Sequence, residues 1–229
     1  MGRRKTNILM LLVMLVVGIA NIIWTEKLPV GEGLGWDGVN YAAWAKNFYK
    51  SAFVDRVEDY YVQRLLPSAL VHYGARAAFW PFYSRDESLK ILNENNNIIL
   101  CFGIYNLALL VLAVYTWGLI ADQLLISDRG KWFGFCFLFV NYAILKLNFY
   151  APVSTDTSGF VLGLLLFYFF LARKPFGLLA VMVAGSFTWP TLPFLAWLFS
   201  FFLILEDRCR PFHFRLTPVS ADWLCCSRC

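Results

Sequence analysis

Residues 98–121 read IILCFGIYNLALLVLAVYTWGLIA, an apolar run without a single charged residue. The run exceeds the roughly 20 apolar residues with which an α-helix crosses the hydrocarbon core of a bilayer. The rest of the chain agrees, because 59% of its 229 residues are hydrophobic and 15% are charged, whereas an ordinary soluble domain has about 25% charged residues. The sequence therefore predicts an all-α polytopic membrane protein.

A second apolar run, residues 8–24, lies near the N-terminus behind Arg3, Arg4 and Lys5. A charged start before an apolar centre is also typical of a signal peptide. No small-residue cleavage site follows, however, and the run is long enough to span. We therefore expect a retained first span with its cationic end in the cytoplasm.

Four further apolar runs predict spans at about 132–147, 159–172, 176–188 and 192–205. Residues 176–205 could instead form one long span. We favour two, because Pro190 and Pro193 interrupt the helix pattern between them. About six spans then make a membrane domain of residues 1–205, followed by a cytoplasmic tail, residues 206–229. The tail has no helical period, and we interpret it as truncated or frame-shifted.

Basic residues support this topology. If the spans alternate, Arg129 and Lys131 in one link and Arg173 and Lys174 in another share the side of the N-terminus, as the positive-inside rule requires. The net charge of +5 is therefore attributed to span ends and lipid headgroups, with membrane lipids and not nucleic acid as partners. We expect an integral multi-pass protein of a bacterial inner membrane.

Residues 26–97 form a long polar loop between the first two spans, on the non-cytoplasmic face in this topology. Loops of this length are usually functional or disordered, and the many aromatic residues argue against disorder. Residues 39–50 and 61–80 show helical spacing of apolar side chains. We expect both to lie as helices in the membrane interface.

Asp37 is the first candidate for chemistry in this loop. A carboxylate there could accept a proton from a hydroxyl, or hold a divalent cation against a phosphate. It could equally cap the helix that follows it. Asp59 lies in an acidic cluster with Asp55 and Glu58 and is the second possible metal ligand, unless the cluster is a solvated turn. A divalent cation is thus a conceivable cofactor, and the metal remains undetermined.

Two basic residues are candidates for a lipid phosphate. Arg64 has the planar, bidentate fork that suits phosphate, although it could also anchor to headgroups or pair with an acidic neighbour. Lys146, near the far end of the third span, would reach the same face, unless it merely extends to the headgroups. Three asparagines, Asn21, Asn106 and Asn141, lie inside predicted spans, where we expect them to bond between helices.

Four further residues are candidates for binding the sugar or the acceptor. Asp156 lies among hydroxyl residues where the fourth span begins, and acidic residues at spans are functional candidates by default, although a helix cap is the alternative. The other members of the group are Trp36, Tyr41 and His72; a lone histidine is more often structural. No phosphate-binding glycine loop, dinucleotide fingerprint or Ser-His-Asp pattern occurs.

The layout resembles that of the membrane glycosyltransferases of the GT-C superfamily. The likeness rests on three stretches: GWDGVNYAAWA (35–45), YVQRLLPSALVHY (61–73) and NFYAPVSTDTSGF (148–160). The resemblance implies a polyprenyl-phosphate-linked sugar donor and inverting transfer to an acceptor hydroxyl on the non-cytoplasmic face. It also implies that Asp37, the acidic residue of the first loop, serves as base or metal contact.

The chain departs from the superfamily in two ways. Protein mannosyltransferases carry adjacent Asp-Glu in this motif, whereas Gly38 follows Asp37 here. The superfamily usually has more spans, so this chain is expected to be a truncated member. Two other classes of function stay open: a transporter or flippase with polar groups on broken helices, and a non-enzymatic membrane subunit that uses the loop as a docking surface.

Overall fold

The computed structural model describes residues 3–55, 63–79 and 94–208 of the chain. The regular structure in these residues is helical, and none of them lies in a strand. The predicted all-α fold is thereby confirmed. The tail beyond residue 208 and the acidic cluster around Asp59 lie outside the described residues.

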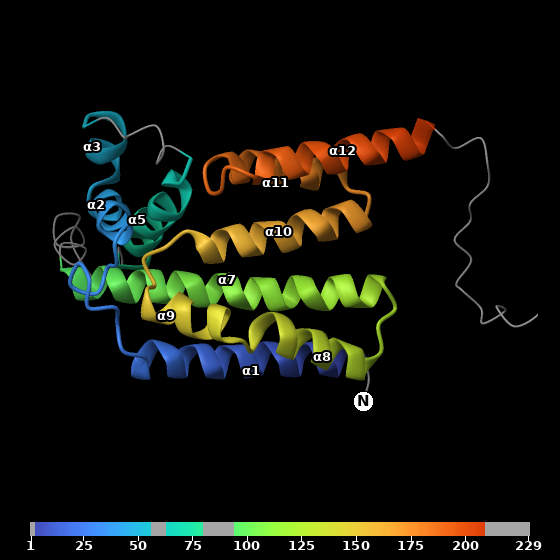
Figure 1. Cartoon of the computed structure of the whole chain (residues 1–229), viewed down its shortest axis with the longest axis horizontal. Helices are drawn as coiled ribbons and strands as arrows, with labels where there is room; N and C mark the ends of the chain where they lie inside the picture. The colour runs from blue at the N-terminus through green and yellow to red at the C-terminus, as the bar shows by residue number, and fades with distance from the viewer. Residues whose placement is uncertain (1–2, 56–62, 80–93, 209–229) are drawn as a thin grey trace, which may run out of the picture.

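The body of the molecule is a bundle of helices that run alternately from one end to the other (Figure 1). Its long helices are α1 (Arg3–Trp24), α7 (Asn95–Gln123), α10 (Asp156–Leu171), α11 (Pro175–Ser186) and α12 (Leu192–Arg208). Helix α7 packs against α1 on one side and α10 on the other, and α11 pairs with α12. The helix α8 (Asp128–Phe139) runs back beside α1 and continues into η1 (Ala143–Leu147) and α9 (Asn148–Tyr150).

The predicted count of six spans is not met. Among the described residues, Arg4–Trp24 and Asn95–Gln123 are long and apolar enough to cross a membrane, and the bent pair Asp128–Phe139 with Ala143–Tyr150 makes a third if it counts as one span. The remaining helices of 16, 12 and 17 residues measure roughly 24, 18 and 26 Å at about 1.5 Å per residue. They are apolar but shorter than a hydrocarbon core of about 30 Å.

The segment 176–205 does form two helices. Helix α11 ends at Ser186 and α12 begins at Leu192, so the chain turns at Trp189 and Pro190 as the prolines indicated. Figure 1 shows this turn at the same end of the bundle as α2 and α5.

The loop between α1 and α7 forms a helical cap on that end. It contains α2 (Gly38–Lys46), α3 (Phe48–Phe53) and α5 (Leu65–Phe79). The predicted helix 39–50 is divided, because Asn47 adopts an extended backbone with φ −142° and ψ 73°. The predicted helix 61–80 is described from Leu65, and Pro67 lies within its first turn, where proline is tolerated. The cap has its own core, in which Tyr41, Ala45 and Val71 pack against Ile98 and Phe102 of α7.

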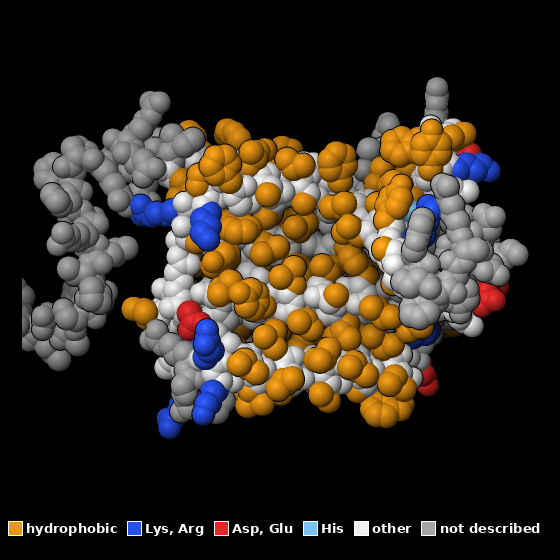
Figure 2. Space-filling view, turned by 180° about the vertical axis from the view of Figure 1, so that it is seen from behind, with side chains coloured by type: hydrophobic (Ala, Val, Ile, Leu, Met, Phe, Trp, Pro, Cys, Tyr) orange, Lys and Arg blue, Asp and Glu red, His pale blue; other side chains and the backbone are white. Residues whose placement is uncertain are grey.

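The outside of the bundle is apolar in its middle. Figure 2 shows hydrophobic side chains across the centre of one face, with lysine and arginine side chains at its two ends. This distribution suits a protein surrounded by lipid.

The end of the bundle opposite the cap carries a buried charge cluster. The Lys131 Nζ is fully buried and donates hydrogen bonds to Asp122 Oδ1 at 2.6 Å and Asn7 Oδ1 at 3.1 Å. Asn7 in turn donates to Asp122 Oδ2 at 2.9 Å. The sequence predicts that Lys131 shares the side of the N-terminus, and its bond to Asn7 is compatible with that. Its buried ammonium also joins α1, α7 and α8, a role that the sequence did not indicate.

Candidate functional site

Four of the predicted site residues line one pocket beneath the cap. Asp37, Tyr41, Arg64 and Asp156 surround a cavity of about 250 Å³, and Trp36 forms part of its rim. They come from three separate segments: the start of α2, the residues before α5, and the loop that leads into α10. Residues far apart in the sequence thus meet in one place.

Arg64 lies at the centre of this group. Its Nη1 donates a hydrogen bond to the Tyr41 Oη at 3.1 Å and lies 3.8 Å from the Asp37 Oδ2. Its guanidinium carbon is 5.0 Å from the centre of the Trp189 ring, within reach of a cation–π attraction. The Arg64 side chain is 14% exposed and the Asp37 side chain 51%. The cation is therefore held inside while the carboxylate faces the opening.

Asp37 is placed by the start of α2. It occupies the N-cap position, but its side chain makes no capping hydrogen bond, so the capping alternative does not account for its carboxylate. Gly38 allows a close approach here, since a Cβ at this position would lie 2.9 Å from the Val153 carbonyl oxygen. Glutamate directly after Asp37 would therefore displace backbone, which is a physical reason for Gly38 where other proteins carry Asp-Glu.

Arg64 is placed by backbone contacts on both sides of α5. The Leu66 N–H donates to the Phe187 carbonyl at 2.9 Å, which joins the start of α5 to the α11–α12 turn. The Ser68 Oγ donates to the Tyr41 carbonyl at 3.1 Å, which joins α5 to α2. These two bonds hold the arginine between the cap and the turn.

Asp156 is placed by a loop anchored to α7. Asn106 on α7 donates from its amide nitrogen to the carbonyls of Asn148 and Pro152 at 3.1 and 2.8 Å, so its predicted bond between helices is confirmed. The same prediction is wrong for Asn21 and Asn141, whose amide nitrogens donate to carbonyls three or four positions earlier in the chain. Asp156 then begins α10, and Thr155 instead occupies the N-cap position. The Asp156 side chain stays exposed at the pocket rim.

Electrostatics differ between members of the pocket. Partial loss of hydration raises the pKa of Asp156, the Arg64 charge opposes this rise, and the Asp37 charge adds to it. Burial raises the pKa of Tyr41 above its usual range, against the lowering effect of its hydrogen bond from Arg64. Tyr41 is therefore a neutral phenol at physiological pH, able to offer its proton to a ligand.

His72 lies away from this pocket. Its Nδ1 is 2.7 Å from the Ala45 carbonyl oxygen, a hydrogen bond in which the ring is the donor, since a carbonyl oxygen can only accept. The ring is buried against Phe48 and Tyr73. Burial lowers the pKa of His72. The sequence predicted sugar or acceptor binding, whereas the contacts show a histidine that packs α5 against α2.

Lys146 also lies elsewhere. It lines a different and larger cavity, between the end of α1 and the η1 segment, with Glu26, Asn141 and Tyr142. The two residues predicted to bind one phosphate, Arg64 and Lys146, therefore do not share a pocket. The predicted topology assigned both residues to the outer face of the membrane. It could not show whether they line the same pocket.

The possible metal ligands are only partly described. Within the residues that the structure covers, no group of three or more His, Cys, Asp or Glu side chains is placed to hold a metal ion. Asp37 and Asp156 line one pocket, whereas Asp59 lies outside the described residues.

Trp189 is the site residue that sequence reasoning missed. The sequence indicates a helix break at Pro190 and Pro193 but no contact for the neighbouring Trp189. Its ring also packs within 3.3 Å of where a Cβ on Gly159 would lie, so it sits between α10 and the cap. The tryptophan lies beside the prolines of the predicted turn, which could have marked it as a candidate. Nothing in the sequence indicated that it contacts Arg64.

Comparison with known proteins gives no assignment. No protein family, curated protein or solved structure matches the chain.

Proposed function

We propose that the chain is a membrane glycosyltransferase of the GT-C kind, which moves a sugar from a polyprenyl-phosphate donor to an acceptor hydroxyl on the non-cytoplasmic face. The supporting observation is the shared pocket of Asp37, Tyr41, Arg64 and Asp156. A carboxylate base beside a buried arginine is the pair of charges that this reaction needs: one to remove a proton and one to neutralise a leaving phosphate.

In the proposed reaction, the Asp37 carboxylate accepts the proton of the acceptor hydroxyl. The hydroxyl oxygen attacks the anomeric carbon as the bond from that carbon to the phosphate oxygen breaks, which inverts the configuration. The electron pair of the broken bond leaves on the lipid phosphate. Arg64 and the Tyr41 hydroxyl, 3.1 Å apart, neutralise and hydrogen-bond this phosphate.

Exposure supports the division of roles. Asp37 is half exposed at the opening, where an acceptor can reach it. Asp156, whose pKa is raised, is at the same rim and would hydrogen-bond sugar hydroxyls. Trp36, 75% exposed, offers a flat apolar face of the kind on which sugar rings rest.

Location supports the same proposal. The N-terminus, the start of α8 with Arg129, and the α10–α11 link with Arg173 and Lys174 lie at the end of the bundle opposite the cap (Figure 1). With that end in the cytoplasm, the pocket faces the outer side of a bacterial inner membrane, where lipid-linked sugars are used.

The test is a titration of the purified full chain with polyprenyl-phosphate sugars, followed by a transfer assay with hydroxyl acceptors. We expect saturable binding that Arg64→Ala abolishes and Asp37→Asn leaves intact, because the arginine neutralises the phosphate whereas Asp37 does not contact it. Transfer should fall in both variants. Transfer that is unchanged in both variants would overturn the proposal, as would the absence of binding to any lipid-linked sugar.

A further inference from the structure

The helical segment formed by α8, η1 and α9 is broken near its middle, and a cavity of about 760 Å³ lies beside the break. Helix α8 ends at Phe139, η1 begins at Ala143 with π-type bonding, and the two parts are bent by 52°. Short π segments are frequent at functional sites. Irregular backbone at membrane depth is tolerated mainly where it is buried or lines a polar cavity.

Asn141 stabilises the break from within. Its amide nitrogen donates to the Phe137 and Leu138 carbonyls at 3.0 and 3.1 Å, and its Oδ1 accepts from the Ile144 N–H at 2.9 Å. The side chain thus satisfies backbone groups on both sides of the bend. Because these side-chain bonds satisfy backbone groups at the bend, the bend is a stable part of the fold.

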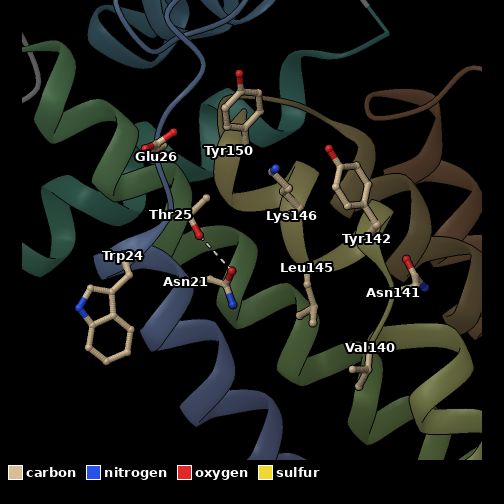
Figure 3. A pocket seen from close by; sticks show the side chains of 10 residues that line it. All are labelled: Asn21, Trp24, Thr25, Glu26, Val140, Asn141, Tyr142, Leu145, Lys146 and Tyr150. Carbon is tan, nitrogen blue, oxygen red and sulfur yellow. Dashed lines mark hydrogen bonds between the residues drawn. The ribbon is translucent and has the colours of Figure 1, made fainter.

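The resulting cavity of about 760 Å³ lies between the end of α1 and the η1 segment. Its volume is within the range of about 300 to 1,000 Å³ that is typical of small-molecule sites. Figure 3 shows the lining side chains, with Asn21, Trp24, Thr25 and Glu26 from the α1 side and Lys146 from η1.

Lys146 carries a positive charge into this cavity. Its Nζ lies 5.2 Å from the centre of the Tyr142 ring and 6.0 Å from that of Tyr150, so two aromatic faces flank the ammonium (Figure 3). Within the described part of the chain, no carboxylate lies within 4.0 Å of it. An ammonium placed between two rings keeps its three donors available for an anion.

Glu26 brings a negative charge to the α1 side of the same cavity. It forms no ion pair with Lys146 or with any other described residue. A simple anion would meet Lys146 but be opposed by Glu26. A ligand with both a negative and a positive group satisfies the two side chains at once.

The surroundings indicate that such a ligand comes from the bilayer. Two apolar side chains that line the cavity, Trp24 and Val140, are 77% and 50% exposed. A tryptophan at the end of an apolar helix is typical of the headgroup level of a membrane. The cavity is thus polar and charged within and apolar at its margins.

We propose that this cavity binds the headgroup of a zwitterionic phospholipid bearing a primary amine, with the phosphate on Lys146 and the ammonium on Glu26. The ester oxygens of the headgroup face the Tyr142 hydroxyl, and the acyl chains run along the exposed faces of α1 and α8. This site is separate from the Asp37 pocket and does not rest on the proposed transferase activity.

The test is native mass spectrometry of the detergent-solubilised full chain, titrated with phosphatidylethanolamine, phosphatidylcholine and phosphatidylglycerol of equal acyl composition. We expect phosphatidylethanolamine to bind most tightly. Lys146→Met should weaken its binding about tenfold, the effect of one charge-assisted hydrogen bond. Glu26→Gln should remove the preference over phosphatidylglycerol, because the site then no longer opposes a net negative headgroup.

Lys174→Met is the matched control, since Lys174 also lies over a tyrosine, with its Nζ 5.9 Å from the Tyr168 ring, but lines neither cavity described above. It should leave all three affinities unchanged. If Lys174→Met and Lys146→Met lower the affinity for phosphatidylethanolamine equally, the lipid binds through non-specific surface charge, and the proposed site is wrong. A preference for phosphatidylglycerol in the unaltered chain would overturn the zwitterionic assignment. Glu26→Gln changes an exposed residue, so it tests the proposal even if Lys146→Met does not fold.

Discussion

Arg64 lies with its guanidinium carbon 5.0 Å from the centre of the Trp189 ring, which joins the cap to the turn between α11 and α12. The contact connects two residues more than 120 positions apart in the sequence. It also fixes the face that the arginine presents to Asp37 and Tyr41. The proposed phosphate contact therefore depends on a residue that does not itself reach the phosphate.

Trp189→Ala is expected to weaken binding of a polyprenyl-phosphate sugar about fivefold, since a cation–π contact of about 1 kcal/mol orients Arg64. Trp189→Phe should retain most of the affinity. Trp197→Ala is the control, because Trp197 is exposed on α12 and stacks with Phe201. Equal effects of Trp189→Ala and Trp197→Ala in a binding titration would contradict this role.

Asp37→Asn is expected to lower the transfer rate at least about a hundredfold while donor binding stays within about twofold, because a missing general base slows chemistry only. Asp55→Asn makes the same change of charge in the same loop, at an exposed residue outside the pocket, and should retain full activity. Single-turnover transfer measured beside donor titration separates the two effects. A donor affinity that falls in parallel with the rate would assign Asp37 to binding instead.

Gly38→Ala is expected to destabilise the cap by about 1 to 3 kcal/mol, because the new Cβ would lie 2.9 Å from the Val153 carbonyl oxygen and backbone must shift. Gly74→Ala on α5 is the matched control. A Cβ there meets no atom within 4 Å, so helix propensity should stabilise the chain by about 0.5 to 1 kcal/mol. Thermal unfolding in detergent measures both, and opposite signs are the expected result.

Lys131→Met is expected to lower the free energy of unfolding by about 2 to 3 kcal/mol. The change leaves the Asp122 carboxylate and the Asn7 amide oxygen without their buried donor, and breaking a fully buried pair costs about 3 to 5 kcal/mol. The effect should be smaller here because the Asp122 side chain is 35% exposed. Lys174→Met, at an exposed lysine, should change the unfolding free energy by no more than about 0.5 kcal/mol.

Acid is expected to destabilise the cap through His72. Burial lowers the pKa of this imidazole in the folded state, so the unfolded chain binds the proton more readily. Stability should be constant above the unfolded pKa of about 6.5 and should decline as the pH falls below it. His72→Gln should remove this decline, whereas substitution of the other histidine, His213 in the tail, should not. An unchanged pH profile in His72→Gln would contradict the assignment.

The residues themselves determined the helical class and much of the candidate site. Apolar runs predicted most of the helices, because a helix buried in lipid or protein needs apolar side chains along its length. Two prolines predicted the turn between α11 and α12. Residue chemistry selected Asp37, Tyr41, Arg64 and Asp156, which do line one pocket. Their catalytic and binding roles stay predictions.

The number of spans was less well predicted. The apolar runs from residue 159 onward looked like spans, but α10 and α11 contain 16 and 12 residues. Hydropathy measures the apolar character of a run, whereas the length of a helix depends on where the backbone turns. Helix α10 ends at Leu171, just before Arg173 turns the chain with a φ of 54°, and α11 ends at Ser186.

Tertiary structure alone decided which distant residues meet. Trp189 joined Arg64, whereas Lys146 joined Glu26 in a separate cavity. Lys131 became a buried partner of Asp122, and His72 a donor to the cap backbone. The physical reason is that a sequence period fixes only the face of a helix on which a side chain lies. The rotation and packing of each helix against the others fix what that face touches.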